Sequence, residues 1–240
     1  MISEIYNQIL YIPLLNALIY IYNTISLESL GFAVIILTII IRIILFPLFH
    51  KMTKNQMVLQ KIQPLIKATT EKHKDNKEEQ VKKILEIYKT NKVNPFSSIG
   101  FLLIQIPILL ALFHVFVKGF TDETLVNLYS FIYKPDQIHS IFLNLINLEK
   151  MSIIIVVLAA FSQYMQGQLS LLKNDVNKND PAQKIGRQMI YIAPALTFFI
   201  LLGLPSVIGL YWITTSVFSI GQQIIINHSL KNYGKDQANN

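Results

Sequence analysis

The most prominent pattern along the chain is a series of long apolar runs separated by polar, lysine-rich stretches. A helix needs about 20 mostly apolar residues to cross the hydrocarbon core of a bilayer. The last run, residues 188–226, is too long for one crossing, and Gly203 and Pro205 mark a tight turn within it. The pattern therefore predicts an all-α membrane protein with five transmembrane helices. We place these spans at residues 30–50, 95–117, 151–172, 188–203 and 206–227.

The segment before the first span, residues 1–29, is also apolar but carries a polar face. Gln8, Asn16 and Asn23 recur every seven or eight positions, which places them on one side of a helix. This pattern favours an interfacial helix that lies in the headgroup plane on the extracytoplasmic side. A sixth span is the alternative for residues 4–25.

Residues 51–94 are rich in lysine, yet their apolar positions recur every three or four residues in two stretches. Between these stretches, the polar residues from Lys74 to Lys77 are typical of a turn. The pattern predicts an antiparallel helical hairpin outside the bilayer. The remaining polar segments are two loops and a tail, at residues 118–150, 173–187 and 228–240.

The distribution of positive charge predicts the orientation. Seventeen lysine and arginine residues lie in 51–94, 171–187 and the C-terminal tail, whereas the loop 118–150 holds three. Loops rich in lysine and arginine stay in the cytoplasm. We therefore expect a multi-pass protein of the bacterial cell (inner) membrane, with its N-terminus outside and its C-terminus inside. An odd number of spans satisfies this orientation, and six spans would not.

Composition agrees with a membrane protein and excludes several functions. Hydrophobic residues make up 52% of the chain and charged residues only 15%, against about 25% charged in a soluble domain. The chain has no cysteine, which excludes disulfides, thiol catalysis and cysteine-bound metals. No lysine or arginine precedes Arg42, so we expect no cleaved signal peptide. The loop lysines account for the net charge of +7, and we expect no direct DNA binding.

Seven short stretches, spread in order over about residues 10–228, carry a resemblance to a known family. They are Ile41–Leu48, Lys61–Pro64, Val93–Pro95, Leu103–Pro107, Leu204–Ser206, Leu210–Trp212 and Phe218–Gln223. Taken together, they resemble the YidC family of membrane protein insertases, which has mitochondrial and chloroplast relatives. The family arginine maps onto Arg42. Compared with some relatives, we expect a short tail with two lysines and no large extracytoplasmic domain.

The resemblance implies a five-span core around a hydrophilic groove that is open to the cytoplasm and to lipid but closed toward the outside. It implies nascent membrane-protein clients and contact with membrane lipids. The ribosome, the signal recognition particle receptor and the Sec translocon are candidate partners. The expected function is insertion and folding of client membrane proteins without ATP.

Arg42 is the most informative single residue, because it lies well inside an apolar span. An arginine at mid-membrane costs about 2.5–3.5 kcal/mol on translocon scales. One interpretation is that its side chain extends to the cytoplasmic headgroups. The other is a cation that faces a water-filled cavity and acts on clients. None of the five predicted spans contains an acidic residue that would neutralise it.

Other polar residues within the spans are candidates for lining the same groove. They are Gln105 in the second span, Gln163 and Gln166 in the third, and a helical stripe of Trp212, Thr215, Ser219 and Gln222 in the fifth. The alternative is that these side chains form hydrogen bonds between packed helices. Trp212 could equally be a lipid-facing packing residue.

No catalytic motif is recognisable. The sequence has no H-E-x-x-H, P-loop or G-x-S-x-G, and its predicted spans hold no paired carboxylates for acid–base chemistry. We therefore expect a protein that is not an enzyme and that uses no catalytic residue, cofactor or metal. The alternative functions are a small multi-pass transporter and an accessory subunit of another membrane complex.

Overall fold

The computed structural model describes residues 2–170 and 181–238. Parts of the expected third span (171–172), cytoplasmic loop (173–180) and tail (239–240) lie outside the described residues. The helices and strands run in the order α1 (Ile2–Tyr6), the π-helical turn η1 (Asn7–Tyr11), α2 (Ile12–Thr24), α3 (Leu30–Ile44), α4 (Phe46–Lys72), α5 (Lys77–Thr90), α6 (Ser97–Lys118), α7 (Asp122–Leu125), β1 (Ile141–Phe142), β2 (Ile146–Asn147), α8 (Ile153–Ser170), α9 (Pro181–Leu201) and α10 (Ser206–Ala238). The chain is nearly all helical, which confirms the predicted class at this coarse level.

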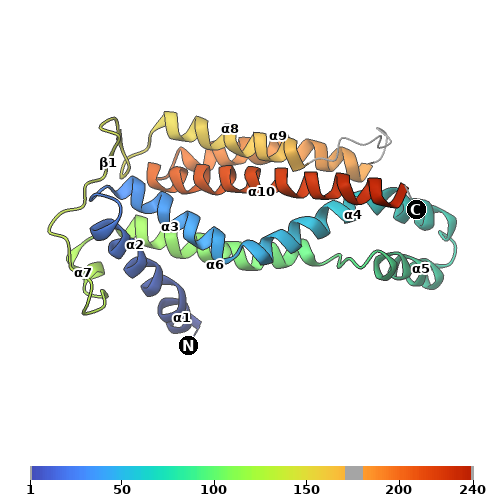
Figure 1. The fold of residues 1–240 in the computed structure, drawn as a ribbon, viewed down its shortest axis with the longest axis horizontal. Coiled ribbons are helices and arrows are strands. Elements are labelled where there is room, and N and C mark those ends of the chain that lie inside the picture. Colours follow the sequence, from blue (N-terminus) through green and yellow to red (C-terminus); the bar gives the residue numbers. More distant parts are fainter. Residues whose placement is uncertain (1, 171–180, 239–240) are drawn as a thin grey trace.

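Most of the long helices run along one axis and form an elongated bundle (Figure 1). Helix α10 packs against α8 and α3, and α9 packs against α8. Buried leucine, isoleucine and valine side chains fill the space between these helices. The lysine-rich pair α4–α5 lies at one end of the bundle, and α7 and β1 lie at the other (Figure 1).

The expected first span, residues 30–50, is not one straight helix. Helix α3 ends at Ile44, and α4 begins at Phe46 after a bend of 68°. Pro47 explains the break, because proline cannot donate the backbone hydrogen bond of a continuous helix and crowds the preceding turn. Helix α4 then continues without interruption to Lys72. The first helix of the expected hairpin therefore starts five residues before position 51.

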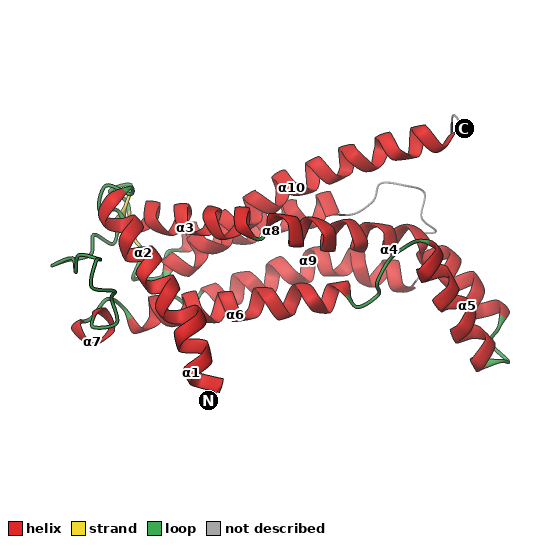
Figure 2. Cartoon of the chain, turned by 60° about the horizontal axis from the view of Figure 1, so that its bottom comes forward, coloured by secondary structure: helices red, strands yellow, loops and turns green. Residues whose placement is uncertain are grey.

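The N-terminal segment forms one continuous helical stretch through α1, η1 and α2, which crosses the bundle obliquely (Figures 1 and 2). Its apolar face is buried, with Leu15, Leu18, Ile19 and Tyr22 almost inaccessible to solvent. By length and composition, residues Glu4–Thr24 could also cross a membrane. An interfacial helix and a sixth span therefore both remain open for this segment, and the interfacial placement stays a prediction.

Two described helical segments, Glu4–Thr24 and α8, are long and apolar enough to span a membrane, and the bent pair α3–α4 would make a third. Shorter apolar helices cover Leu103–Lys118 and Gln188–Leu201. Helix α9 starts before, and α10 ends after, the spans expected at 188–203 and 206–227. These helices are longer than the expected spans because an apolar run marks only the part of a helix that is suited to lipid. The helix itself continues into polar residues.

The loop 118–150 is more ordered than a simple connection. It contains the short helix α7 and an antiparallel pair, in which Ile141 is opposite Asn147. Its end is joined to the first turn of α10, where the Ser206 and Val207 amides donate to the carbonyls of Lys150 and Leu148 at 3.0 Å.

Candidate functional site

Arg42 lies in the last turn of α3 and is buried, with 5% of its surface exposed. Its Nη2 atom donates a hydrogen bond to Oε1 of Gln105 on α6, at 3.2 Å. The Phe49 ring, from the start of α4, lies 4.8 Å from the Arg42 Cζ atom. The bend between α3 and α4 brings Phe49 to this position, seven residues after the arginine. A cation held over an aromatic face is attracted by the negative potential of that face.

Gln105 connects Arg42 to a third helix. Its Nε2 atom donates to the hydroxyl oxygen of Tyr211 on α10, at 2.6 Å. The amide thus uses its acceptor end for the arginine and its donor end for the tyrosine. Tyr211 is 4% exposed, so the series of hydrogen bonds from Arg42 through Gln105 to Tyr211 lies within the bundle. It joins α3, α6 and α10 by polar contacts.

The charge of Arg42 is not cancelled by a carboxylate. In residues 2–170 and 181–238, no aspartate or glutamate forms an ion pair with it. Its contacts with Gln105 and Phe49 orient the guanidinium without removing its positive charge. A cation in such a low-dielectric setting acts more strongly on an approaching negative group than it would in water.

The structure places the other sequence-predicted residues in the same bundle, but it does not join all of them to Arg42. Trp212 is half-buried and packs against the apolar core. Thr215 and Ser219 are half-buried on α10, and Gln222 is 5% exposed. On α8, Gln163 and Gln166 are half-buried. Of the eight candidate residues, Arg42 and Gln105 are joined to each other by a hydrogen bond within the described residues.

Several buried polar atoms have no hydrogen-bond partner within the described part of the chain. Among them are Oε1 of Gln163 and Nε2 of Gln222, which are candidate groove residues, and Nδ1 of His50 and Oγ of Ser97. Buried polar groups are satisfied in nearly all proteins, so such atoms call for water or another polar molecule. They come from four different helices, α8, α10, α4 and α6.

Two parts of this arrangement were not among the residues that the sequence singled out. Tyr211 precedes Trp212 and lies one helical turn before Thr215, so helical spacing alone could have included it in the stripe. The second part is a polar contact around Gln223, whose Nε2 atom donates to the Met57 sulfur at 3.0 Å and to Asn227 at 3.1 Å. Asn227 donates in turn to the Leu169 carbonyl at 3.2 Å, which ties α10 to α8.

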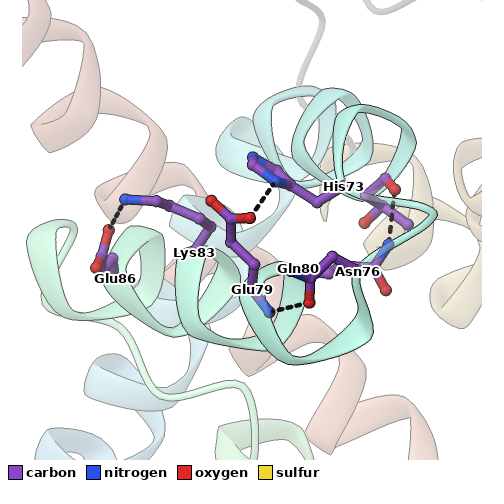
Figure 3. A network of polar contacts seen from close by, with 7 residues as sticks. His73, Asn76, Glu79, Gln80, Lys83 and Glu86 are labelled. Atoms are coloured by element: carbon purple, nitrogen blue, oxygen red, sulfur yellow. Dashed lines mark hydrogen bonds and ion pairs between the residues drawn. The ribbon is translucent and has the colours of Figure 1, made fainter.

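The far end of the α4–α5 pair has its own polar network (Figure 3). The Asn76 side chain accepts from the Glu79 amide at 3.1 Å and caps α5. His73 lies 3.6 Å from a Glu79 oxygen, and Gln80 donates to the Thr70 carbonyl at 2.6 Å. These contacts fix the turn between α4 and α5.

No group of three or more histidine, cysteine, aspartate or glutamate side chains is placed to hold a metal ion in the parts of the chain that the structure describes.

Comparison with known proteins identifies the family. The sequence model of the 60Kd inner membrane protein family matches residues 20–233. A membrane protein insertase YidC of Pelobacter propionicus is 32% identical over 215 residues, which is 90% of this chain and 38% of the relative. One from Enterococcus faecalis is 30% identical over 207 residues, 85% of this chain and 68% of the relative. Membrane protein insertase YidC 1 of Listeria monocytogenes is 29% identical over 214 residues, which is 88% of this chain and 68% of the relative.

The chain thus spans about two fifths of the Pelobacter relative and about two thirds of the other two. The match to the family model covers most of the chain, and it includes α3, α6, α8 and α10, which carry the candidate site. A family of inner membrane proteins and the apolar helices together place the protein in a membrane. The chain therefore belongs to the 60Kd inner membrane protein family, and its resemblance to the YidC insertases is confirmed.

Proposed function

We propose that this protein is a membrane protein insertase that moves the polar tails of client proteins across the bilayer. The names of its relatives support this function. The observation that carries it is the buried Arg42, whose hydrogen-bond partner Gln105 is uncharged. A positive charge kept inside an apolar bundle without a counter-charge is suited to attract a transient negative group.

The proposed mechanism is physical. A polar tail that crosses intact hydrocarbon leaves its backbone groups without hydrogen bonds, at several kcal/mol each. A hydrated groove between the helices would shorten the dry part of this path. Arg42, Gln105, Gln163, Gln166, Trp212, Thr215, Ser219 and Gln222 are the residues that we assign to it. The unpartnered atoms of Gln163 and Gln222 support this assignment, because a client backbone or water can supply their missing hydrogen bonds.

We propose five spans, formed by α3 with the start of α4, α6, α8, α9 and the first part of α10. The oblique course of α1–α2 supports an interfacial helix rather than a sixth span (Figure 1). The positions of α4–α5 and of the loop 118–150 at opposite ends of the bundle support opposite sides of the membrane for them (Figure 1). The lysines of α4 and α5 support a cytoplasmic location for that pair.

The cytoplasmic hairpin α4–α5 would receive clients as they are synthesised. Its capped and hydrogen-bonded turn supports a preformed docking element rather than a flexible linker (Figure 3). We assign to it the contacts with the ribosome, the signal recognition particle receptor or a Sec translocon. Client helices would leave the groove directly into lipid, and their partition into lipid would supply the driving force without ATP.

The test is complementation of a bacterium depleted of its own insertase, with membrane insertion of a small single-span client as the readout. We expect this chain to restore insertion, and Arg42→Glu to restore much less at the same protein level. A transporter or an accessory subunit would leave insertion of the client at the depleted level, which would refute the proposal.

A further inference from the structure

Two turns at the end of the bundle near α7 and β1 present leucines where turns facing water carry polar residues. The first turn joins α2 to α3 and contains Leu27, at φ 53°. The second joins β1 to β2 and contains Leu143, at φ 52°, followed by Leu145. Leu27 and Leu145 are 93% and 84% exposed. Positions with positive φ in turns favour glycine, asparagine and aspartate, so leucine there is unexpected on a surface that faces water.

The two turns form one structural unit. The Leu30 amide, just after the first turn, donates to the His139 carbonyl at 3.2 Å, just before β1. The Phe142 ring lies against Gly31 and makes an edge contact with Phe32, with ring centroids 5.3 Å apart. The two turns that contain the leucines are therefore held together by shared contacts and are not independent loops.

Helix α2 holds the rest of the loop 118–150 in place. The Asn16 side chain donates to the Asn127 carbonyl at 3.0 Å and accepts from the Tyr129 amide at 2.7 Å. Asn23 donates to the Tyr133 carbonyl at 2.7 Å. The polar face of α2 is thus used to bind this loop, in addition to any contact with headgroups.

The exposed apolar surface of the turns leads into the exposed apolar side of a candidate membrane span. The chain passes from β2 to Met151 and then into α8, a candidate span whose first residues Ile153 and Ile154 are also exposed. The β1–β2 turn lies beside this end of α8 (Figure 1). A surface continuous with the lipid-facing side of a span is positioned to meet the same bilayer.

The loop 118–150 has no large net charge that would attract it to a membrane surface or to a charged partner. Residues 118–150 contain three lysines and four carboxylates. Lys134 is paired with Asp122 at 2.8 Å, and this pair holds the pKa of the Asp122 carboxyl below its usual value. The first turn also contains Glu28, whose carboxylate lies 3.8 Å from Nδ1 of His139. Because the turns and the loop carry no excess of positive charge, an interaction of the turns with a membrane would rest on their apolar side chains.

We propose that the turn patch, which consists of Leu27, Ile141, Leu143, Leu145 and Met151, inserts into the bilayer leaflet at this end of the bundle. Its occupant is the boundary between lipid headgroups and acyl chains, which accepts exposed apolar side chains next to polar backbone. The patch anchors the loop 118–150 as a fixed cap over the ends of the spans. The proposal needs a membrane-spanning protein, but it does not depend on insertase activity.

The test measures the depth of single side chains in the bilayer. Because the chain has no cysteine, spin labels can be attached to Leu27→Cys and Leu145→Cys without background. Glu123→Cys, an exposed position in the same loop, is the matched control. Each variant is placed as a single copy in a nanodisc of phosphatidylcholine, and collisions with oxygen and with a water-soluble nickel chelate are compared.

We expect the ratio of oxygen to nickel collisions to be several-fold higher at positions 27 and 145 than at position 123. The result should be unchanged when anionic lipid is added, because the patch is apolar. A ratio at position 145 equal to that of the control would overturn the proposal. Labels shielded from both reagents would also overturn it, since they would show contact with protein. Unchanged melting temperatures of the variants verify that the fold is intact.

Discussion

The Arg42 guanidinium meets an amide oxygen and a phenyl ring in the bundle, and both are uncharged. A hydrogen bond to a charged group contributes about 1.5–3 kcal/mol, which helps to hold the side chain in place. These neutral contacts leave the positive charge without a carboxylate partner among the described residues. The sequence left open whether Arg42 extends to the headgroups or faces a water-filled cavity, and the structure shows a neutral protein partner, Gln105, at its guanidinium.

Substitutions at Arg42 should therefore affect clients more than the fold. Arg42→Ala leaves an unpaired amide, which costs about 1–3 kcal/mol, rather than an unpaired buried charge, which costs about 3–5 kcal/mol. We expect near-normal accumulation in the membrane and slower insertion of clients with acidic tails. Arg42→Lys should retain much of the activity, and Arg42→Glu should be worst. The measurement is an insertion assay on one client whose tail charge is varied, at matched protein levels.

Clients with neutral tails are the control in this series and should be inserted nearly as well by all three variants. Equal losses for acidic and neutral tails would contradict an electrostatic role and leave Arg42 as a packing residue.

Gln105 offers a second test at this scale, because its oxygen faces Arg42 at 3.2 Å. Gln105→Glu replaces that amide by a carboxylate of nearly the same shape, which would form an ion pair with Arg42 and cancel its field. We expect this variant to fold as well as the parent protein and to lose its preference for acidic tails. Gln105→Leu should behave in the opposite way, with lower stability but a retained preference.

The readouts are the melting temperature in detergent and the ratio of insertion rates for acidic and neutral tails. A Gln105→Glu protein that inserts acidic tails normally would show that the local charge of this site does not act on clients.

Among the elements, α8 and α10 are in especially close contact. A Cβ atom at Gly209 on α10 would collide with the Ile155 side chain on α8, so the absence of a side chain at 209 allows the two helices to approach. At Gly221, farther along the same helix, an added Cβ would meet no atom within 4 Å. The two glycines thus lie in the same helix but differ in the space that an added side chain would have.

Gly209→Val should separate α8 from α10 and lower the stability of the protein by about 1–3 kcal/mol, the usual effect of overpacking. Gly221→Ala is the matched control and should leave the melting temperature unchanged or raise it slightly, because alanine favours a helix. Thermal unfolding in detergent, followed by circular dichroism, measures both. Restoration of stability in Gly209→Ala combined with Ile155→Ala would locate the effect at this contact, and equal behaviour of the two glycines would contradict it.

For the whole molecule, the two ends of the bundle differ in charge and in structure. One end carries the α4–α5 pair with eleven lysines in residues 51–94, and the other carries the nearly neutral loop 118–150 (Figure 2 shows α5 and α7 far apart). An apolar bundle between two such ends is oriented in the membrane by the lysines.

This orientation can be measured with single cysteines and a thiol reagent that does not cross membranes. Asn76→Cys, in the turn between α4 and α5, should react only in inside-out vesicles. Asn127→Cys, in the loop 118–150, should react only in intact cells or spheroplasts. Reaction of both positions after detergent solubilisation is the control for accessibility. Labelling of position 76 from outside would reverse the proposed topology.

The sequence by itself determined the helical class and the family resemblance, and it singled out Arg42 as a candidate site residue. These features depend on local signals: long apolar runs, short motifs in order, and one cation among apolar residues. The same signals predicted helices within 51–94, where α4 and α5 form, and a turn near Gly203 and Pro205, between α9 and α10. Such features follow from the neighbours of each residue along the chain.

Only the tertiary structure decided which side chains meet. Gln105 is 63 residues from Arg42, and Tyr211 is 106 residues from Gln105, so no spacing along the chain could pair them. The use of Asn16 and Asn23 to bind the loop 118–150 was likewise hidden, since a polar helical face can meet water, headgroups or protein. The bend at Leu45 depends on both the local sequence and the tertiary packing. Pro47 favours a break there, but the angle that brings Phe49 to Arg42 is set by packing against the other helices.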